Sequence, residues 1–187
     1  MARLWSKRSA VAVVLDDKDP AQASFLFIKR AEFEGDPWSG HMAFPGGRFD
    51  EGDRNGLSTA IREMAEEVGF DVEDADSKRD VNPRVVGRLS DVRTSRRVIA
   101  RPMIISPYVF MVDSRPELIP NYEVAETLWI PYAFFADQDN RDELKFEHAG
   151  MKITLPCYRY DGRVIWGLTL AVIDDLMRTA GVEIKKI

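Results

Sequence analysis

A glycine-rich loop, followed by a helix that carries three closely spaced glutamates, limits the possible folds more than any other feature of this chain. The loop reads Phe-Pro-Gly-Gly at residues 44–47. From Leu57 to Val68, apolar residues recur with the period of an α-helix, and Gly69 suits the left-handed residue that ends many helices. The apolar stripe consists of Leu57, Ile61, Met64, Ala65 and Val68. The sequence therefore predicts an amphipathic helix next to a glycine loop.

Three carboxylates share one face of this helix. Glu63, Glu66 and Glu67 stand at positions i, i+3 and i+4, opposite the apolar stripe. Like charges at i and i+4 destabilise an isolated helix by about 0.2–0.5 kcal/mol, whereas a divalent cation would make the cluster favourable. Mg²⁺ and Mn²⁺ prefer carboxylate, carbonyl and water oxygens, and a carbonyl of the glycine loop can join such a set. The alternative is an ordinary solvated acidic face.

Strand and helix patterns are mixed along the rest of the chain. Short runs rich in β-branched and aromatic residues predict strands at 10–15, 25–28, 85–89, 103–112 and 127–130. A turn-forming segment at 16–20 joins the first two as a hairpin, and glycines and prolines make 34–54 mostly loop. Helical periodicity returns at 168–178. These patterns predict an α/β fold, and 187 residues fit one domain over 1–187.

Composition argues against several classes of protein. No run of 18 apolar residues is present, so we expect no membrane-spanning helix. The N-terminal apolar stretch is too short for a signal-peptide core. The single cysteine, Cys157, cannot form an internal disulfide. We therefore expect a cytoplasmic protein, and the net charge of −5 argues against a nucleic-acid partner.

The helix and its loop resemble a known motif. Residues 62–70 read Arg-Glu-Met-Ala-Glu-Glu-Val-Gly-Phe and are similar to the box of the Nudix hydrolases, which cleave nucleoside diphosphates linked to another moiety. Residues 59–61, Thr-Ala-Ile, also fit that motif. The resemblance sets the box region at 44–70 and implies the fold of the family, an α/β/α sandwich with a mixed β-sheet.

The resemblance also implies metal-assisted hydrolysis. Glu66 and Glu67 would be the principal ligands of Mg²⁺ or Mn²⁺, the Gly46 carbonyl would add another, and Glu63 would either bind the metal or orient water. The cation would neutralise the diphosphate and lower the pKa of the attacking water. Arg62 would hold the glutamates in position through salt bridges.

The loop has the spacing of one branch of this family, the coenzyme A pyrophosphatases. Residues 44–53 match the pattern F-P-G-G-x-x-D-x-x-D, and Arg54 stands where the common box has a glutamate. Asp53 is the displaced acid, which in the common box braces the arginine. Upstream, residues 29–31 and 40–43 resemble the same branch, but the arginine expected between them is missing. That arginine is a plausible contact for the extra phosphate of the nucleotide.

Residues outside the box are candidates for substrate binding and for the general base. Arg30 lies in the upstream segment and is a candidate substrate ligand, and Trp38, in the loop before the box, could stack on a base. Glu123 is a candidate base or further metal ligand, because this fold often recruits one acid from outside the box. Glu126 is the alternative to Glu123.

An arginine cluster within nine residues has three interpretations. Its members are Arg93, Arg96, Arg97 and Arg101. They could bind substrate phosphates, because the guanidinium fork matches phosphate oxygens. They could instead form a solvated loop that balances nearby acids, or contact nucleic acid such as a capped RNA. The lack of interleaved aromatic residues argues against the last interpretation.

These features together predict a Mg²⁺-dependent Nudix pyrophosphohydrolase that acts on a small nucleoside diphosphate derivative, with a coenzyme A-like substrate favoured. ADP-ribose, a dinucleotide or a nucleoside triphosphate is the alternative within this class. The alternative from another class is a non-catalytic Nudix-fold module that senses a ligand or partner. Such relatives commonly lose box glutamates, which this chain retains. The sequence itself does not determine the oligomeric state; relatives are often dimers, so the resemblance is compatible with a homodimer.

Overall fold

A mixed central sheet forms the middle layer of the structure, a computed structural model that describes residues 7–16, 19, 22–36, 38–72, 83–94, 103–148 and 151–186. Its main strands, in the order β3-β2-β1-β7-β5, are β3 (Met42–Ala43), β2 (Ser24–Arg30), β1 (Lys7–Asp16), β7 (Met103–Val112) and β5 (Arg84–Arg88). Three further strands pair with β1, β7 and β2 respectively: β4 (Gly46–Arg48), β6 (Val92–Arg93) and β8 (Val124–Pro131). β1 and β7 are parallel and the other pairs are antiparallel, which confirms the mixed sheet.

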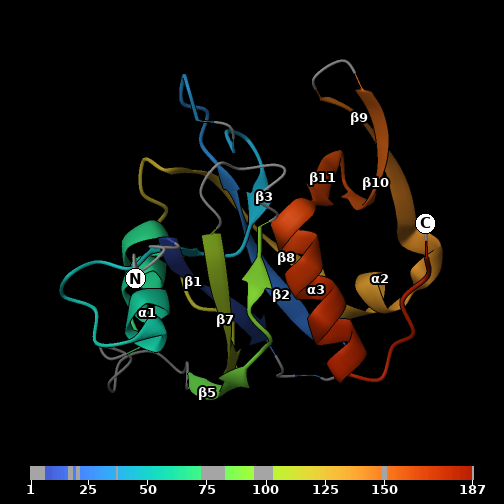
Figure 1. Cartoon of the computed structure of the whole chain (residues 1–187). Coiled ribbons are helices and arrows are strands. Elements are labelled where there is room, and N and C mark those ends of the chain that lie inside the picture. The colour runs from blue at the N-terminus through green and yellow to red at the C-terminus, as the bar shows by residue number, and fades with distance from the viewer. Residues whose placement is uncertain are drawn as a thin grey trace, which may run out of the picture.

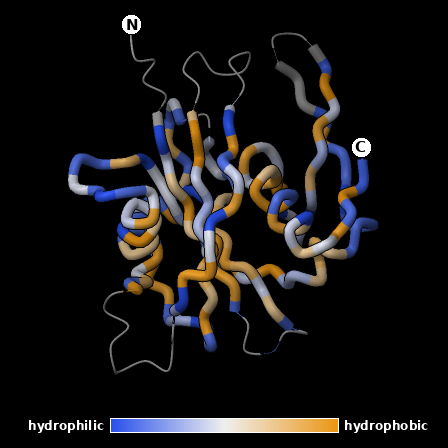
Figure 2. Tube along the Cα trace, turned by 60° about the horizontal axis from the view of Figure 1, so that its bottom comes forward, coloured by the Kyte–Doolittle hydropathy of each residue, from blue (hydrophilic) through white to orange (hydrophobic). Residues whose placement is uncertain are grey.

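Helices cover both faces of this sheet (Figure 1). α1 (Gly56–Val68) packs on one face, and α3 (Gly167–Thr179) with the short α2 (Tyr132–Ala136) packs on the other. Successive side chains of β1 pack on opposite faces of the sheet, so that Ala12 belongs to the core on the α1 side and Val13 to the core on the α3 side. The α/β/α sandwich is thus confirmed. Figure 2 shows hydrophobic residues in the central strands and helices and hydrophilic residues in the outer loops.

The predicted box helix has clear end signals. Asn55 precedes α1, and its side chain accepts the Ser58 amide while the Ser58 hydroxyl accepts the Asn55 amide, so two otherwise unpaired donors are satisfied. At the other end, Gly69 has a φ of 69° and its amide bonds the Ala65 carbonyl. These contacts confirm the helix and its end at Gly69.

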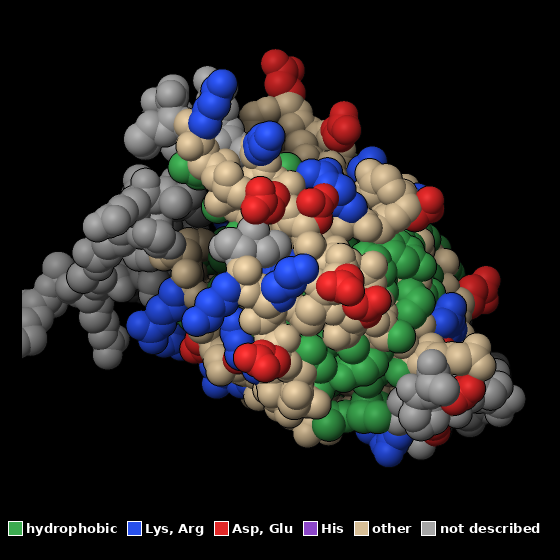
Figure 3. Space-filling view, turned by 90° about the vertical axis from the view of Figure 1, so that its right-hand side faces the viewer, with side chains coloured by type: hydrophobic (Ala, Val, Ile, Leu, Met, Phe, Trp, Pro, Cys, Tyr) green, Lys and Arg blue, Asp and Glu red, His purple; other side chains and the backbone are tan. Residues whose placement is uncertain are grey.

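A second sheet projects from the sandwich and was not predicted from the sequence. It has the order β11-β10-β9 and consists of β11 (Arg163–Trp166), β10 (Met151–Tyr160) and β9 (Arg141–His148), reached from α2 through the 3₁₀ helix η1 (Gln138–Asn140). Charged residues dominate β9, whereas residues 151–155 of β10 (Met-Lys-Ile-Thr-Leu) do alternate between apolar and polar, a strand signal that the prediction from the sequence did not use. Basic and acidic side chains both occur on this side of the molecule, and apolar ones gather toward one part of it (Figure 3). Among the described residues, no helix is long and apolar enough to cross a membrane.

Candidate active site

Gly46 brings the glycine loop between β1 and the box helix. A Cβ at this position would lie 2.4 Å from the Ala10 carbonyl oxygen, and its φ is +153°, so only glycine fits without strain. The Ala12 amide donates to the Pro45 carbonyl at 2.7 Å. Because ladder bonds alternate along an antiparallel pair, both polar groups of Gly46 face away from β1. The Gly46 amide donates to Oε2 of Glu67 at 2.7 Å.

Glu67 is buried, with only 3% of its surface exposed. This corrects the prediction of one acidic face opposite the apolar stripe, because β4 covers the part of α1 from which Glu67 projects. The pKa of Glu67 is raised to about 8: burial raises it most, the bond from the Gly46 amide lowers it, and the nearby Glu63 and Glu123 carboxylates raise it. Burial thus favours the neutral form of this carboxyl group.

The other two box glutamates lie progressively closer to solvent. The side chain of Glu63 is 16% exposed and burial raises its pKa, whereas the side chain of Glu66 is 56% exposed. A Cβ at Gly47 would lie 2.4 Å from Oε1 of Glu63, so the second glycine of the loop leaves room for this carboxylate. The two glycines thus act differently, since Gly46 fits against β1 and Gly47 fits against Glu63.

Arg62 links the glutamates to the loop. Its Nε donates to Oδ1 of Asp53 at 3.1 Å and its Nη2 donates to Oδ2 at 3.0 Å. Arg62 also forms ion pairs of 3.0 Å with Glu63 and Glu66 and donates to the Arg48 carbonyl at 3.0 Å. The hydrogen bonds from Arg62 lower the pKa of Asp53 to about 2. Asp53 therefore occupies the bracing position that the common motif gives to a glutamate one residue later.

The donor atoms suit a hard divalent cation but are not gathered around one point. Within the described part of the chain, no three Asp, Glu, His or Cys side chains form a cluster that could hold a metal ion. Glu63 and Glu66 are instead paired with Arg62, and Glu67 with the Gly46 amide. The raised pKa values of Glu63 and Glu67 show that nearby cations do not fully compensate these carboxylates. A divalent cation would supply that compensation once the carboxylates release their present partners.

The structure brings Glu123, and not Glu126, to the box. Glu123 lies close enough to raise the pKa of both Glu63 and Glu67, and its carbonyl accepts the Ala31 amide at 2.7 Å. Glu126 instead forms an ion pair with Arg163, which lowers the pKa of Glu126. Of the two candidate acids outside the box, Glu123 alone is in a position to act with the glutamates of α1.

Arg30 also lies beside the box, which its sequence position alone did not show. Arg30 lowers the pKa of Glu67, and its Nη2 donates to Asp36 at 3.0 Å. Its Nε is buried and has no hydrogen-bond partner within the described residues. Asp36 also accepts the Trp38 amide at 3.1 Å, so one carboxylate holds both predicted substrate ligands. No periodicity in the sequence marks a loop residue such as Asp36, so its role could not be predicted.

The arginine cluster is only partly described. Arg93 is exposed on β6 and lies near Asp91, and β7 and β1 separate β6 from β4. The structure thus does not bring Arg93 to the glutamates. Arg96, Arg97 and Arg101 lie outside the described residues.

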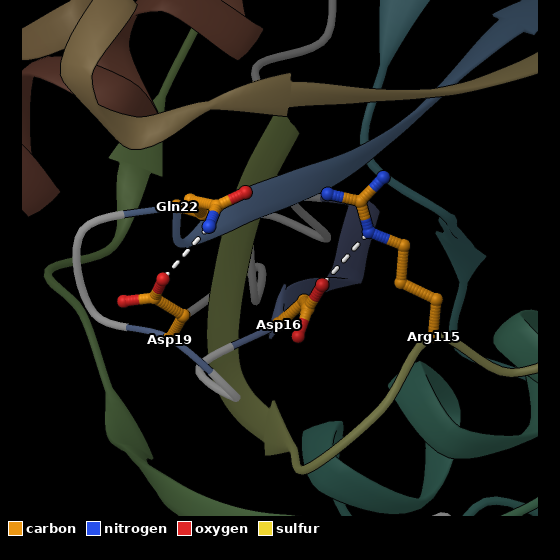
Figure 4. Close-up of a pocket in the computed structure, with 4 residues that line it drawn as sticks. All are labelled: Asp16, Asp19, Gln22 and Arg115. Carbon is orange, nitrogen blue, oxygen red and sulfur yellow. Dashed lines mark hydrogen bonds and ion pairs between the residues drawn. The ribbon is translucent and has the colours of Figure 1, made fainter.

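A polar pocket lies at the far end of β1 from Gly46 (Figure 4). Its lining residues are Asp16, Asp19, Gln22 and Arg115. Arg115 pairs with Asp16 at 2.7 Å, and the Gln22 amide donates to Asp19 at 2.8 Å. These side chains bind one another, and the pocket is separate from the box glutamates.

Known proteins resemble this chain in sequence along most of its length. Residues 6–150 match the family model of the NUDIX domain. An uncharacterized protein of Schizosaccharomyces pombe is 32% identical over 144 residues, which cover 68% of this chain and 42% of that protein. Nudix hydrolase 22 of Arabidopsis thaliana is 28% identical over 178 residues, which cover 91% of this chain and 54% of the relative. This chain therefore spans about half the length of these two relatives. The mitochondrial coenzyme A diphosphatase NUDT8 of Mus musculus is 30% identical over 181 residues, 94% of this chain and 79% of that protein.

Solved structures share the fold at lower sequence identity. A MutT/nudix family protein from Enterococcus faecalis has a TM-score of 0.64 and 18% identity, covering 97% of this chain and 64% of that chain. The NUDIX domain of Shewanella oneidensis NrtR, solved with ADP ribose, has a TM-score of 0.59 and 17% identity, covering 96% and 90%.

Proposed function

Because this chain belongs to the Nudix family, we propose that it hydrolyses the diphosphate of a small nucleoside diphosphate derivative with the help of Mg²⁺ or Mn²⁺. One observation carries the proposal most directly. Glu67 is buried beside Gly46, Glu63 lies partly buried beside Gly47, and the pKa of each carboxyl group is raised. Folding alone would not favour such a pair, whereas binding of a cation would.

The residues of the box would have two roles, metal binding and positioning of the metal ligands. Glu63, Glu66, Glu67 and the Gly46 carbonyl are the groups that would hold the cation. Bound there, Mg²⁺ supplies charge neutralisation and a lower pKa for the attacking water. Arg62, fixed by Asp53, would position the glutamates.

The general base would come from outside the box. Glu123 would accept the proton of the water that attacks one phosphorus atom. The bridging P–O bond would break, and the two products would each keep one phosphate. Among the two acids considered, the proximity of Glu123 to Glu63 and Glu67 supports this role, and the pairing of Glu126 with Arg163 argues against Glu126.

A coenzyme A-like molecule is the substrate that we favour. The loop spacing from Phe44 to Asp53 supports it, and so does the similarity to the mouse coenzyme A diphosphatase. Arg30, with its unpartnered Nε beside Glu67, is a candidate contact for the diphosphate. ADP-ribose, which the Shewanella NUDIX domain binds in its crystal structure, is the main alternative together with dinucleotides and nucleoside triphosphates. We expect a cytoplasmic homodimer with no nucleic-acid partner.

A panel of candidate substrates tests the proposal. Coenzyme A, ADP-ribose, NADH, diadenosine polyphosphates, nucleoside triphosphates and capped RNA would be incubated with and without Mg²⁺, and the products identified by mass. We expect metal-dependent release of phosphopantetheine and a 3′,5′-nucleoside bisphosphate from coenzyme A. Cleavage of another compound and not of coenzyme A would assign that compound as the substrate and would still support metal-dependent hydrolysis of a diphosphate. Binding of a compound without hydrolysis, in protein shown to bind Mg²⁺, would favour the sensor alternative.

A further inference from the structure

Two large aromatic side chains are exposed side by side on the surface. Phe33, in the loop after β2, is 44% exposed, and Tyr122, just before β8, is 78% exposed. Their rings meet edge to face, with centroids 6.3 Å apart and planes at 83°. Aromatic side chains of this size are usually buried to a large extent.

The two rings lie beside the candidate active site. The Tyr122 hydroxyl hydrogen-bonds the Glu123 carboxylate, which itself lies close to Glu67. The loop that carries Tyr122 is bonded to the end of α1, because the Asn121 amide donates to the Glu67 carbonyl at 2.9 Å. The Ala31 amide bonds the Glu123 carbonyl at 2.7 Å and joins this loop to the one that carries Phe33.

The loop backbones that carry the two exposed rings are held by hydrogen bonds. The Phe33 amide donates to the Ser39 hydroxyl at 2.9 Å, and that hydroxyl donates to the Phe33 carbonyl at 2.8 Å. On the other loop, the Glu123 amide donates to the Asn121 side chain at 2.8 Å. A surface that is fixed before binding loses less conformational entropy when a ligand stacks on it.

We propose that Phe33 and Tyr122 form an aromatic platform for the nucleobase of the substrate, whose diphosphate lies at the glutamates of α1. Because the two ring planes are at 83°, the base stacks on the more exposed ring of Tyr122, and Phe33 packs against that ring and holds it in place. This inference rests on the proposed function and adds a specificity subsite to it. Every nucleobase has a flat π-face that suits aromatic side chains. Arg30, beside Glu67, would attract the negatively charged end of the same molecule. A platform of two rings next to a cluster of carboxylates suits a nucleotide better than an apolar protein surface.

Equilibrium binding separates stacking of the base from binding of the diphosphate. ADP carries a base and a diphosphate, whereas inorganic diphosphate carries the second group alone. Calorimetric titrations in Mg²⁺ would compare the wild-type protein with Phe33→Ala and Tyr122→Ala. We expect Tyr122→Ala to weaken ADP binding by about fivefold or more, the lower end of what one base stack contributes. Phe33→Ala, which removes the ring that packs against Tyr122, should weaken it in the same direction by a smaller factor. The affinity for inorganic diphosphate should not change.

Two control variants separate the aromatic surface from other effects. Tyr122→Phe keeps the ring and removes the hydroxyl, so ADP affinity should persist even if turnover changes through Glu123. Ile119→Ala removes an exposed apolar side chain from the same loop and should leave both affinities unchanged. Circular dichroism spectra would show that each variant is folded.

Three outcomes would overturn the platform. ADP affinity could persist in both alanine variants, the two ligands could weaken equally, or the wild-type protein could bind neither. The proposed function fails separately, because a protein that binds ADP through the platform but hydrolyses no member of the substrate panel would refute catalysis alone. If the protein hydrolyses a member of the panel but its ADP affinity is the same in Phe33→Ala and Tyr122→Ala as in the wild type, the platform alone is refuted.

Discussion

The carboxyl group of Glu67 and its neighbours set the chemistry of the site at the scale of single residues. Glu67 is buried next to two other acids, and its pKa is raised to about 8. Asp53, only nine residues before Arg62 in the chain, has its pKa lowered to about 2 by the hydrogen bonds from that arginine. The pKa values of two carboxylates of the same motif are thus shifted in opposite directions, because burial has the largest effect at Glu67, whereas the hydrogen bonds from the Arg62 guanidinium have the largest effect at Asp53.

Glu67→Gln should abolish most turnover without unfolding the protein. The new side chain removes a metal ligand but keeps an oxygen that can accept the Gly46 amide. We expect turnover to fall by about 100-fold or more, measured on the best substrate of the panel. The exposed acid Glu51 provides the control, since Glu51→Gln should keep full activity. Unchanged turnover in Glu67→Gln would contradict the assignment of Glu67 as a ligand.

The same substitution should change how stability depends on pH when metal is absent. In the folded state the pKa of Glu67 is about 8, above its ordinary value of 4.5, so the folded protein retains a proton that the unfolded chain releases in this window. Wild-type stability should therefore fall as pH rises from 4.5 to 8, and Glu67→Gln should remove a part of this fall of the order of 1–4 kcal/mol. Urea unfolding in EDTA at pH 5 and pH 8 measures it. Parallel profiles for the two proteins would refute the burial argument.

Asp53→Asn tests the brace on Arg62. The side chain of Asp53 is only 4% exposed and accepts bonds from Arg62, Thr59 and the Asp50 amide. We expect a loss of about 2 kcal/mol in the free energy of unfolding, because a charged acceptor is replaced by a neutral one. Turnover should also fall as Arg62 loses its anchor. Since the pKa of Asp53 is lowered, this contribution is present above pH 3.8 and is lost as pH falls through about 2. Asp50→Asn, on an exposed neighbour, should change neither property.

At the scale of elements, the contact between β4 and α1 creates the site. Gly46 fits against the backbone of β1, whereas Gly47 faces the flexible end of Glu63. A side chain at position 46 would therefore meet rigid backbone, whereas one at position 47 would meet a side chain that can move. We expect a substitution at 46 to lower stability and one at 47 to lower activity.

Alanine substitutions at Gly46 and Gly47 test whether the two positions affect stability and activity differently. Gly46→Ala should destabilise the protein by about 2 kcal/mol or more, because backbone must move at a strained φ. Gly47→Ala should displace Glu63 and reduce turnover with a smaller loss of stability. Gly52→Ala, which meets nothing within 4 Å, is the matched control. Thermal melts and initial rates check both effects, and equal losses of stability at 46 and 47 would contradict the distinction.

At the scale of the whole molecule, a buried ion pair joins the projecting sheet to the sandwich. Arg141 on β9 donates to both oxygens of Asp174 on α3, at 2.7 and 2.8 Å. Tyr158 on β10 lies beneath the guanidinium and packs among the aromatic residues of the α3 layer. The second sheet is thereby part of the same core as the first.

Arg141→Met should destabilise the protein by about 3–5 kcal/mol, because it leaves the Asp174 carboxylate without its partner. The double variant Arg141→Met, Asp174→Leu should regain most of this loss, since an apolar pair of similar volume can replace a buried ion pair. A double-mutant cycle in urea measures the coupling. Simple additivity of the two single losses would show that the pair does not join the sheets energetically.

Local patterns in the sequence determined the box helix, its ending at Gly69, the glycine loop before it and the mixed α/β fold. Helical and strand periods, end signals and glycine conformations depend on neighbouring residues, so a sequence displays them directly. The same local spacing placed Glu63, Glu66 and Glu67 on one helix, although it wrongly assigned Glu67 to an open face.

Only the tertiary structure decided which groups meet at the site. The burial of Glu67, the choice of Glu123 over Glu126, the place of Arg30 and the pairing of Phe33 with Tyr122 all depend on contacts between distant segments. The projecting sheet was missed although residues 151–155 of β10 alternate, because that signal is short and because the charged strand β9 is stabilised by pairing with β10 and by the Arg141–Asp174 contact. Burial is set by whatever element covers a residue, and local sequence does not encode that.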